Sequence, residues 1–400
     1  MKRNWLLLLT LLLAASLLTS IFYVIHSAER KPPEGFYFGV SYGLSTVSEA
    51  KLLIDRVKDY TNFFVVNNWD ISTNETALNE ICDYAAENGL SFIVFFDFIS
   101  LGKHIPPLFH DEYPWHENWV LTAKDRWKDK FLGIYIYEEP GGKQIDTGLF
   151  DEFSNVHGAE RYRMFENVTS YSEAAEVFVR ELPQSYSYHF LQNSNISKFV
   201  SDYALYWFDY LADYDTVFAE LGWNHSTPQQ IGLNRGAATL QNKDWGTIIT
   251  WKSIREESAA IKSDSEMFQD MMDSYEAGAN YVIVFNFPQF PEGNPFGVLT
   301  DEHFIVMEQF WEHASRNQEE YGKATGQVAF VLPKDYGWGM RALNDKIWGL
   351  WPADELAPII WENMNKLIDK YDLQLDIVYD DSRFNYEHYS EVFFWNATIN

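Results

Sequence analysis

The feature that most constrains the fold is a repeated alternation of short apolar runs and helical patterns, which begins at Gly35. The apolar runs are rich in β-branched and aromatic residues, as strands are, and most are followed by a segment with helical periodicity. The predicted strands are Phe36–Ser41, Phe63–Asn67, Phe92–Phe98, Phe131–Tyr137, Tyr203–Asp209, Gly246–Lys252 and Tyr281–Phe287. Strands that alternate with helices form a parallel sheet whose faces the helices cover.

The helical patterns complete this α/β arrangement. The predicted helices are Thr46–Tyr60, Thr76–Asn88, Asn118–Trp127, Ser172–Leu182 and Ser265–Ala277. The first begins with Thr46 and Glu49 at the spacing of a capping box. Seven strand–helix units over about 285 residues fit the size of a (β/α)8, or TIM-like, barrel. We expect the eighth strand at Phe296–Leu299, before a helix at Glu302–Ala314.

A second, smaller unit follows the predicted barrel. Strands are predicted at Gln327–Leu332, Leu375–Tyr379 and Val392–Trp395, with a helix at Ala357–Lys370. This is a small α/β appendage, too short for a complete doubly wound domain. The predicted organisation is therefore an N-terminal segment over residues 1–30, a barrel over 35–320 and the appendage over 326–400.

The N-terminal segment predicts export. Lys2 and Arg3 precede an apolar run from Trp5 to Ile25. A cleavable signal peptide has an apolar region of roughly 7–15 residues, whereas this run approaches the ~20 residues that span a bilayer as a helix. We expect an uncleaved signal-anchor, which would hold a single-pass protein in the cell membrane with the remaining chain outside. A cleaved signal peptide and secretion remain the alternative.

Composition excludes several classes of function. The chain has 30 Lys and Arg against 58 Asp and Glu, a formal net charge of −28, which argues against nucleic acid because phosphate binding needs clustered cations. The sequence has no P-loop, no GxGxxG after a strand and no GxSxG, so we expect no nucleotide, no cofactor and no serine nucleophile. Aromatic residues make up 17% of the chain, which fits either sugar-stacking surfaces or an aromatic core.

The strongest catalytic candidates follow the strand Phe131–Tyr137. In a barrel of this kind, functional residues lie at the C-terminal ends of the strands. Strand alternation places Tyr135 and Tyr137 toward the interior, and Glu139 continues that register. Aromatic surroundings raise the pKa of a carboxyl group toward that of a general acid, so Glu139 is the first candidate and Glu138 the second. The alternative is that both only cap a loop or pair with Lys or Arg.

The same residues carry a family resemblance. The run Tyr137-Glu138-Glu139-Pro140-Gly141-Gly142 resembles the Asp/Glu-Glu-Pro turn of many glycoside-hydrolase-like TIM barrels. The start Gly39–Gly43 and the strand Trp245–Lys252 look like those of uncharacterised archaeal membrane-anchored proteins of that kind. The run Val328–Gly339 resembles the start of the glutaminase-like, flavodoxin-type domain of family 42 β-galactosidases. The resemblance implies that Glu139 is the acid/base.

The chain departs from that family pattern at a second position. Retaining members carry a nucleophilic Glu at the end of strand seven, whereas the strand predicted to be seventh, Tyr281–Phe287, contains Asn286 and no carboxylate. Glycosidic cleavage normally needs two carboxyl groups, about 5–5.5 Å apart for retention or about 6.5–9.5 Å for inversion. We expect Asp209 to be the second one, and Asp97 is the alternative. Glu220, which follows a predicted helix at Thr216–Ala219, is expected to be solvated.

Polar and aromatic residues at the other strand ends are predicted to bind the substrate. These residues are Tyr42, Asn67, Trp69, Tyr137, Trp207, Trp251, Lys252 and Asn286. A loop with His104, His110 and His116 beside acidic residues lacks a His/Cys metal signature, so we expect no metal site and interpret it as a substrate-covering loop.

Three hypotheses of function follow from the sequence. The first is a membrane-anchored glycoside hydrolase that cleaves an extracellular or cell-surface glycan. The second is a carbohydrate-binding or cell-envelope structural protein on the same barrel without catalysis. The third, which we rank last, is a metal-dependent polysaccharide deacetylase that uses the His104–His116 loop.

Overall fold

The computed structural model describes residues 31–96, 115–146, 168–182, 191, 194–253, 260–288 and 293–399. Eight parallel strands close into a barrel, in the spatial order β1-β10-β7-β6-β5-β4-β3-β2. They are β1 (Tyr37–Tyr42), β2 (Phe63–Val66), β3 (Ser91–Phe95), β4 (Phe131–Glu138), β5 (Ser197–Asp202), β6 (Thr216–Leu221), β7 (Asp244–Ile249) and β10 (Tyr281–Val284). Two short strands, β8 (Trp251–Ser253) and β9 (Ala260–Ile261), form a separate hairpin. The chain is therefore a (β/α)8 barrel, as predicted.

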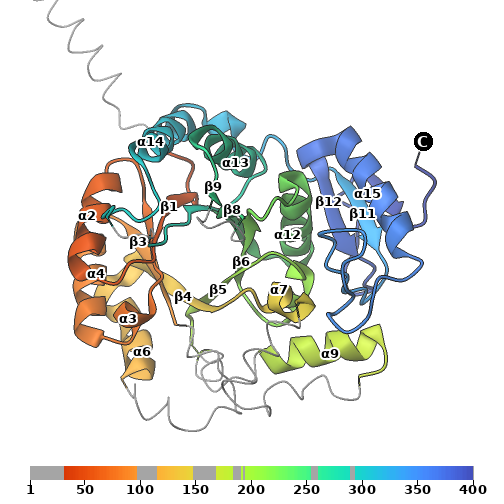
Figure 1. Ribbon diagram of the computed structural model, residues 1–400, viewed down its shortest axis with the longest axis horizontal. Helices are drawn as coiled ribbons and strands as arrows, with labels where there is room; N and C mark the ends of the chain where they lie inside the picture. Colours follow the sequence, from red (N-terminus) through yellow and green to blue (C-terminus); the bar gives the residue numbers. More distant parts are fainter. Residues whose placement is uncertain are drawn as a thin grey trace, which may run out of the picture.

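Helices surround the barrel (Figure 1). They are α2 (Val47–Val57), α3 (Trp69–Ser72), α4 (Glu75–Glu87), α6 (His116–Trp127), α7 (Pro140–Ile145), α11 (Tyr206–Leu211), α12 (Thr227–Gln241), α13 (Asp264–Glu276) and α14 (Asp301–Arg316). A further helix, α9 (Tyr171–Glu181), lies beside the C-terminal part of the chain (Figure 1). The predicted start of α2 is confirmed, because the Thr46 side chain accepts a hydrogen bond from the Glu49 N–H. Ser263 and Glu266 form a reciprocal capping box at the start of α13.

Three element predictions are wrong. The run predicted as a strand at Tyr203–Asp209 is a turn followed by the helix α11, and strand five is the preceding segment β5. The run predicted as a helix at Thr216–Ala219 is the strand β6. Phe296–Leu299 forms no strand, so β6 is the missing member of the barrel and β10 is its eighth strand. Aromatic residues in Tyr203–Asp209 favoured a strand where the chain forms a helix, whereas the β-branched and aromatic residues of Thr216–Ala219 favour the strand that the structure shows.

The barrel interior is mainly aromatic. Its core consists of Phe63, Val65, Ile93, Phe95, Tyr135, Phe199, Phe218, Ile248, Tyr281 and Ile283. Glycine on neighbouring strands makes room for these rings: a Cβ at Gly246 would lie 2.7 Å from the Tyr281 Cβ. Much of the aromatic content therefore fills a core, which was one of the two interpretations left open by the sequence.

The C-terminal unit contains a three-stranded parallel sheet in the order β12-β11-β13, made of β11 (Val328–Leu332), β12 (Leu375–Tyr379) and β13 (Glu391–Phe394). The helix α15 (Ala357–Tyr371) packs on β11 and β12. On the barrel side, α12 lies against β12 (Figure 1). Two glycines allow this approach, because a Cβ at Gly232 would lie 2.6 Å from the Leu375 carbonyl oxygen, and Gly236 meets Val378.

A buried ion pair joins the same two elements. Arg235 on α12 donates from Nε to Asp376 Oδ1 on β12 at 2.7 Å, and the two side chains are 3% and 1% exposed. Its other nitrogens donate to backbone carbonyls, including those of Ala324 and Leu373. Tyr389 donates to the second oxygen of Asp376 at 2.9 Å. The barrel and the C-terminal unit therefore share one continuous core.

Candidate functional site

A bulge at the end of β4 determines which glutamate faces the barrel interior. Tyr135 pairs with Phe199 on β5, but the next registered pair is Glu138 with Ser201, so β4 carries one extra residue. Tyr135 Oη lies 3.4 Å from Glu138 Oε1 and donates to Ser201 Oγ at 2.6 Å. Glu138 therefore takes the inward register, and the predicted register, which gave this place to Glu139, is wrong.

Glu139 lies at the turn from β4 into α7. Its backbone is left-handed, with φ of 58°, and its N–H still donates to the Ser201 carbonyl. Lys143, one helical turn later, lies 3.6 Å from Glu139 Oε2, and its Nζ donates to the Glu138 carbonyl. The Glu139 side chain is 20% exposed, so it reaches the solvent at the mouth of the barrel.

The third carboxyl group is Glu220, which the sequence analysis set aside as a solvated helix residue. It is the fifth residue of β6 and is only 3% exposed. Its Oε1 accepts a hydrogen bond from Ser201 Oγ at 2.8 Å, and its Oε2 accepts one from Trp223 Nε1 at 3.0 Å. Burial raises the pKa of this carboxyl well above its usual value, and the charges of Glu139 and Glu138 raise it further. The surroundings of Glu220 therefore favour its protonated form.

The backbone is strained around these carboxyls. Apart from Glu139, positive φ angles occur at Leu205 (56°) after β5 and at Trp223 (55°) and Asn224 (59°) after β6. Such conformations are unfavourable for residues other than glycine and tend to gather at functional sites. Three consecutive strands of the barrel thus end in strained turns beside the glutamates.

Asp209, predicted as the second carboxylate, does not lie at a strand end. It lies within α11, is 0% exposed and has no hydrogen-bond donor to either oxygen among the described residues. Burial raises its pKa well above the usual value, and the charge of Asp202 adds to this. A substrate cannot reach it, so its assignment as a catalytic residue is wrong.

Asp202, at the end of β5, is the carboxylate next to Asp209. It accepts hydrogen bonds from the N–H groups of Gly141 and Gly142 in the first turn of α7, and from those of Tyr203 and Ala204. These contacts fix the start of α7, which follows Glu138 and Glu139 in the chain, against the end of β5. The pKa of Asp202 is raised to about 7, because the effect of burial outweighs that of the four N–H donors, which lower it.

Several predicted substrate-binding residues have other roles. Tyr42 is buried and its hydroxyl contacts the Thr46 carbonyl, while the ring of Trp207 packs on Tyr379 and Phe384 of the C-terminal unit. Lys252 is on the surface and pairs with Glu266 at 2.7 Å. The predictions for Tyr42 and Trp207 are wrong because tertiary packing buries each side chain, whereas the role of Lys252 stays a prediction.

The remaining candidates have mixed outcomes. Asn286 is 0% exposed, so it does not reach the solvent, and its side-chain amide has no hydrogen-bond partner among the described residues. Asn67 follows β2 and is partly exposed, and Trp69 begins α3 and is 38% exposed. Asp97 lies outside the described residues, and of Tyr137 and Trp251 the structure describes only the backbone, in β4 and β8.

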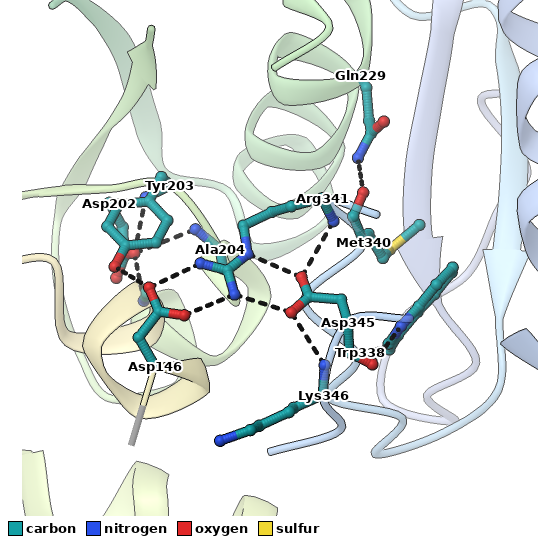
Figure 2. Close-up of polar contacts among 11 residues, drawn as sticks. Asp146, Asp202, Tyr203, Ala204, Gln229, Trp338, Met340, Arg341, Asp345 and Lys346 are labelled. Carbon is teal, nitrogen blue, oxygen red and sulfur yellow. Dashed lines mark hydrogen bonds and ion pairs between the residues drawn. The ribbon is translucent and has the colours of Figure 1, made fainter. Parts of the chain in front are cut away.

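The C-terminal unit reaches the mouth of the barrel through Arg341 (Figure 2). Its guanidinium bonds both oxygens of Asp146, at the end of α7, at 2.8 and 2.7 Å, and also pairs with Asp345. Tyr203 donates to the same Asp146 at 2.9 Å. As a result α7 is held at its start by Asp202 and at its end by Arg341.

The histidine loop gives no metal centre in the described part of the chain. His116 is 6% exposed, and its Nε2 lies 3.1 Å from the Ser72 carbonyl oxygen. Burial lowers the pKa of this imidazole to about 4. Its predicted companions His104 and His110 lie outside the described residues. Among the described residues, no group of three or more His, Cys, Asp and Glu side chains is placed to hold a metal ion.

The membrane segment is also beyond the described chain. From residue 31 onward, the described helices are all too short or too polar to cross a bilayer. Residues 1–30, which carry the predicted anchor, lie outside the description.

One signal in the sequence could have revealed Glu220. The run Thr216-Val-Phe-Ala-Glu-Leu221 is rich in strand formers and is followed by Gly222. A barrel of this type needs eight strands, and no strand was predicted between Asp209 and Gly246. Treating the run as that strand would have placed Glu220 at a strand end.

Comparisons with known proteins find likeness in fold only. No family model and no curated protein matches the chain. D-psicose 3-epimerase from Clostridium cellulolyticum H10 aligns over 72% of this chain and 100% of its own, with 10% identity and a TM-score of 0.37. The GH99 endo-alpha-mannosidase from Bacteroides thetaiotaomicron aligns over 69% and 82%, with 11% identity and a TM-score of 0.42. Saccharomyces cerevisiae Gas2p, solved with laminaritetraose and laminaripentaose, aligns over 70% and 64%, with 11% identity and a TM-score of 0.39.

Proposed function

We propose that this protein is a glycoside hydrolase in which Glu220 is the general acid and Glu138 the general base. The observation that carries the proposal is the environment of Glu220. A carboxyl group that is 3% exposed lies at the mouth of a (β/α)8 barrel, close enough to two other glutamates for their charges to raise its pKa. A buried carboxyl group whose pKa is raised is typical of a general acid.

The chemistry follows from these positions. Glu220, protonated, would give its proton to the oxygen of the leaving sugar, while Glu138 would take a proton from the water that attacks the anomeric carbon. Glu139 is more exposed and pairs with Lys143, so its negative charge would stabilise the positive charge that develops on the sugar ring. The indole of Trp223, fixed by its bond to Glu220, offers a surface on which a sugar ring could stack.

Leaving-group dependence provides the test. We expect the purified protein to cleave members of a panel of aryl glycosides and cell-surface polysaccharides. Glu220→Gln should lose on the order of 10²–10⁴-fold in kcat on polysaccharides and much less on dinitrophenyl glycosides, whose leaving group needs no proton. Glu138→Gln should lose activity on both, and azide, a nucleophile that needs no base, should restore part of it. Glu362→Gln, on the surface of α15, is the matched control.

A carbohydrate-binding protein without catalysis is the second candidate. The observation in its favour is that the seventh barrel strand β7 ends at Ile249 and is followed by Thr250, with no carboxyl group where retaining enzymes of the resembling family carry their nucleophile. In that case, polysaccharides should bind without turnover, and Glu220→Gln should retain binding. Turnover that is identical in the wild type and in Glu220→Gln would remove the acid role.

We also propose that the barrel acts outside the cytoplasm. The support is the apolar run from Trp5 to Ile25 behind Lys2 and Arg3, whose length suits a signal-anchor. The full chain should sediment with membranes and its barrel should be accessible to protease added outside intact cells. Deleting residues 1–28 should leave it in the cytoplasm.

A further inference from the structure

We infer that the hydroxyl groups of Tyr135 and Ser201 form a proton relay that returns a proton from Glu138 to Glu220 between turnovers. This inference rests on the proposed function. It starts from a continuous chain of contacts: Glu138 Oε1 to Tyr135 Oη at 3.4 Å, Tyr135 Oη to Ser201 Oγ at 2.6 Å, and Ser201 Oγ to Glu220 Oε1 at 2.8 Å.

The need for such a relay follows from the proton balance of an inverting hydrolysis. In each turnover the acid loses one proton to the leaving sugar and the base gains one from water. The reaction therefore ends with Glu220 ionised and Glu138 protonated. A second turnover requires one proton to move from Glu138 to Glu220.

The contacts allow that movement without any net change in the hydroxyls. Glu138 gives its proton to Tyr135 Oη, the former Tyr135 proton passes to Ser201 Oγ, and the former Ser201 proton passes to Glu220 Oε1. Each hydroxyl gains one proton and loses one. Tyr135 donates toward Ser201, and Ser201 donates toward Glu220, which is the direction that this transfer requires.

Burial favours this internal route over exchange with solvent. Tyr135 and Ser201 are 0% and 1% exposed, and Glu220 is 3% exposed. Burial and the charges of Glu138 and Glu220 raise the pKa of Tyr135 well above its usual value, so the phenol relays a proton by exchange and does not ionise.

The first experiment compares single and multiple turnovers on a cleaved aryl glycoside. In Tyr135→Phe, the first turnover should keep its rate within about twofold, while the steady-state kcat falls on the order of 10²-fold with KM unchanged. Small buffer acids such as formate should restore kcat, and Ser201→Ala should behave alike. Tyr281→Phe, another interior tyrosine but at the opposite end of the barrel, should match the wild type. If the rate of the first turnover and the steady-state kcat fell by the same factor in Tyr135→Phe, the relay would be overturned.

A second measurement needs no turnover. The infrared band of the protonated Glu220 carboxyl, assigned by its loss in Glu220→Gln, can be titrated in the full-length protein. Removing the Tyr135 hydroxyl weakens the bond that Ser201 donates to ionised Glu220, so the pH midpoint of the band should rise in Tyr135→Phe and not in Tyr281→Phe. An unchanged midpoint in Tyr135→Phe would contradict the relay. Loss of hydrolysis in Glu220→Gln tests the proposed function separately.

Discussion

The contact between the barrel and the C-terminal unit gives the sharpest prediction about stability. In Arg235→Met, the guanidinium of a pair whose members are 3% and 1% exposed is replaced by an apolar chain of similar length. Asp376 then keeps the hydrogen bond from Tyr389 but loses its counter-charge. Removing one partner of a buried pair costs about 3–5 kcal/mol, because the other charge is left without compensation.

The measurement is urea denaturation, with tryptophan fluorescence and circular dichroism followed together. We expect the free energy of unfolding to fall by about 3–5 kcal/mol in Arg235→Met. In the double variant Arg235→Met with Asp376→Leu, part of that loss should be recovered, because the uncompensated charge is gone. Lys252→Met is the control. It breaks a surface pair whose side chains are 47% and 45% exposed, and such a change should cost less than about 1 kcal/mol.

Two results would refute this reasoning. A loss below about 1 kcal/mol in Arg235→Met would mean that the ion pair contributes no more than a surface pair. A double variant less stable than Arg235→Met would mean that the carboxylate of Asp376, and not its charge balance with Arg235, stabilises the interface. Arg235 also donates a hydrogen bond to the Leu373 carbonyl of the C-terminal unit. We therefore expect the C-terminal unit of Arg235→Met to unfold before the barrel, so that the transitions followed by fluorescence and by circular dichroism have different urea midpoints.

Three further predictions concern other parts of the chain. The raised pKa of Asp209 means that the folded state binds a proton that the unfolded state releases above about pH 4, so wild-type stability should fall as pH rises by up to about 1.4 kcal/mol per unit. Asp209→Asn should make that fall shallower above about pH 4, and parallel urea midpoints in the two proteins would contradict it. Arg341→Met leaves Asp146 and Asp345 without their shared cation and should cost about 2–3 kcal/mol in urea denaturation, less than Arg235→Met because Asp146 is 36% exposed. A chain that begins at Pro32 should be soluble and monodisperse in size-exclusion chromatography, since an apolar anchor has lipid as its partner, and aggregation would argue that the anchor packs on the barrel.

The sequence determined the architecture of this protein because periodicity is a local property. Alternating strand and helix patterns were enough to predict a closed parallel barrel, and the start of α2 at Thr46 was correct. The sequence also pointed to the end of β4 as the place to look for carboxyl groups, since Glu138 and Glu139 directly follow an apolar strand.

Tertiary structure decided which side chains meet. One extra residue in β4 turns Glu138 inward, and that bulge is defined by pairing with Ser201, a residue distant in the sequence. The pKa of Glu220 is raised because β6 lies in the barrel wall and removes the carboxyl from water, whereas a carboxyl after a surface helix at Thr216–Ala219 would stay solvated. Asp209 shows the reverse, because α11 buries a group that a strand would have exposed. Burial and strand register depend on contacts across the whole fold, so local patterns of residues could not supply them.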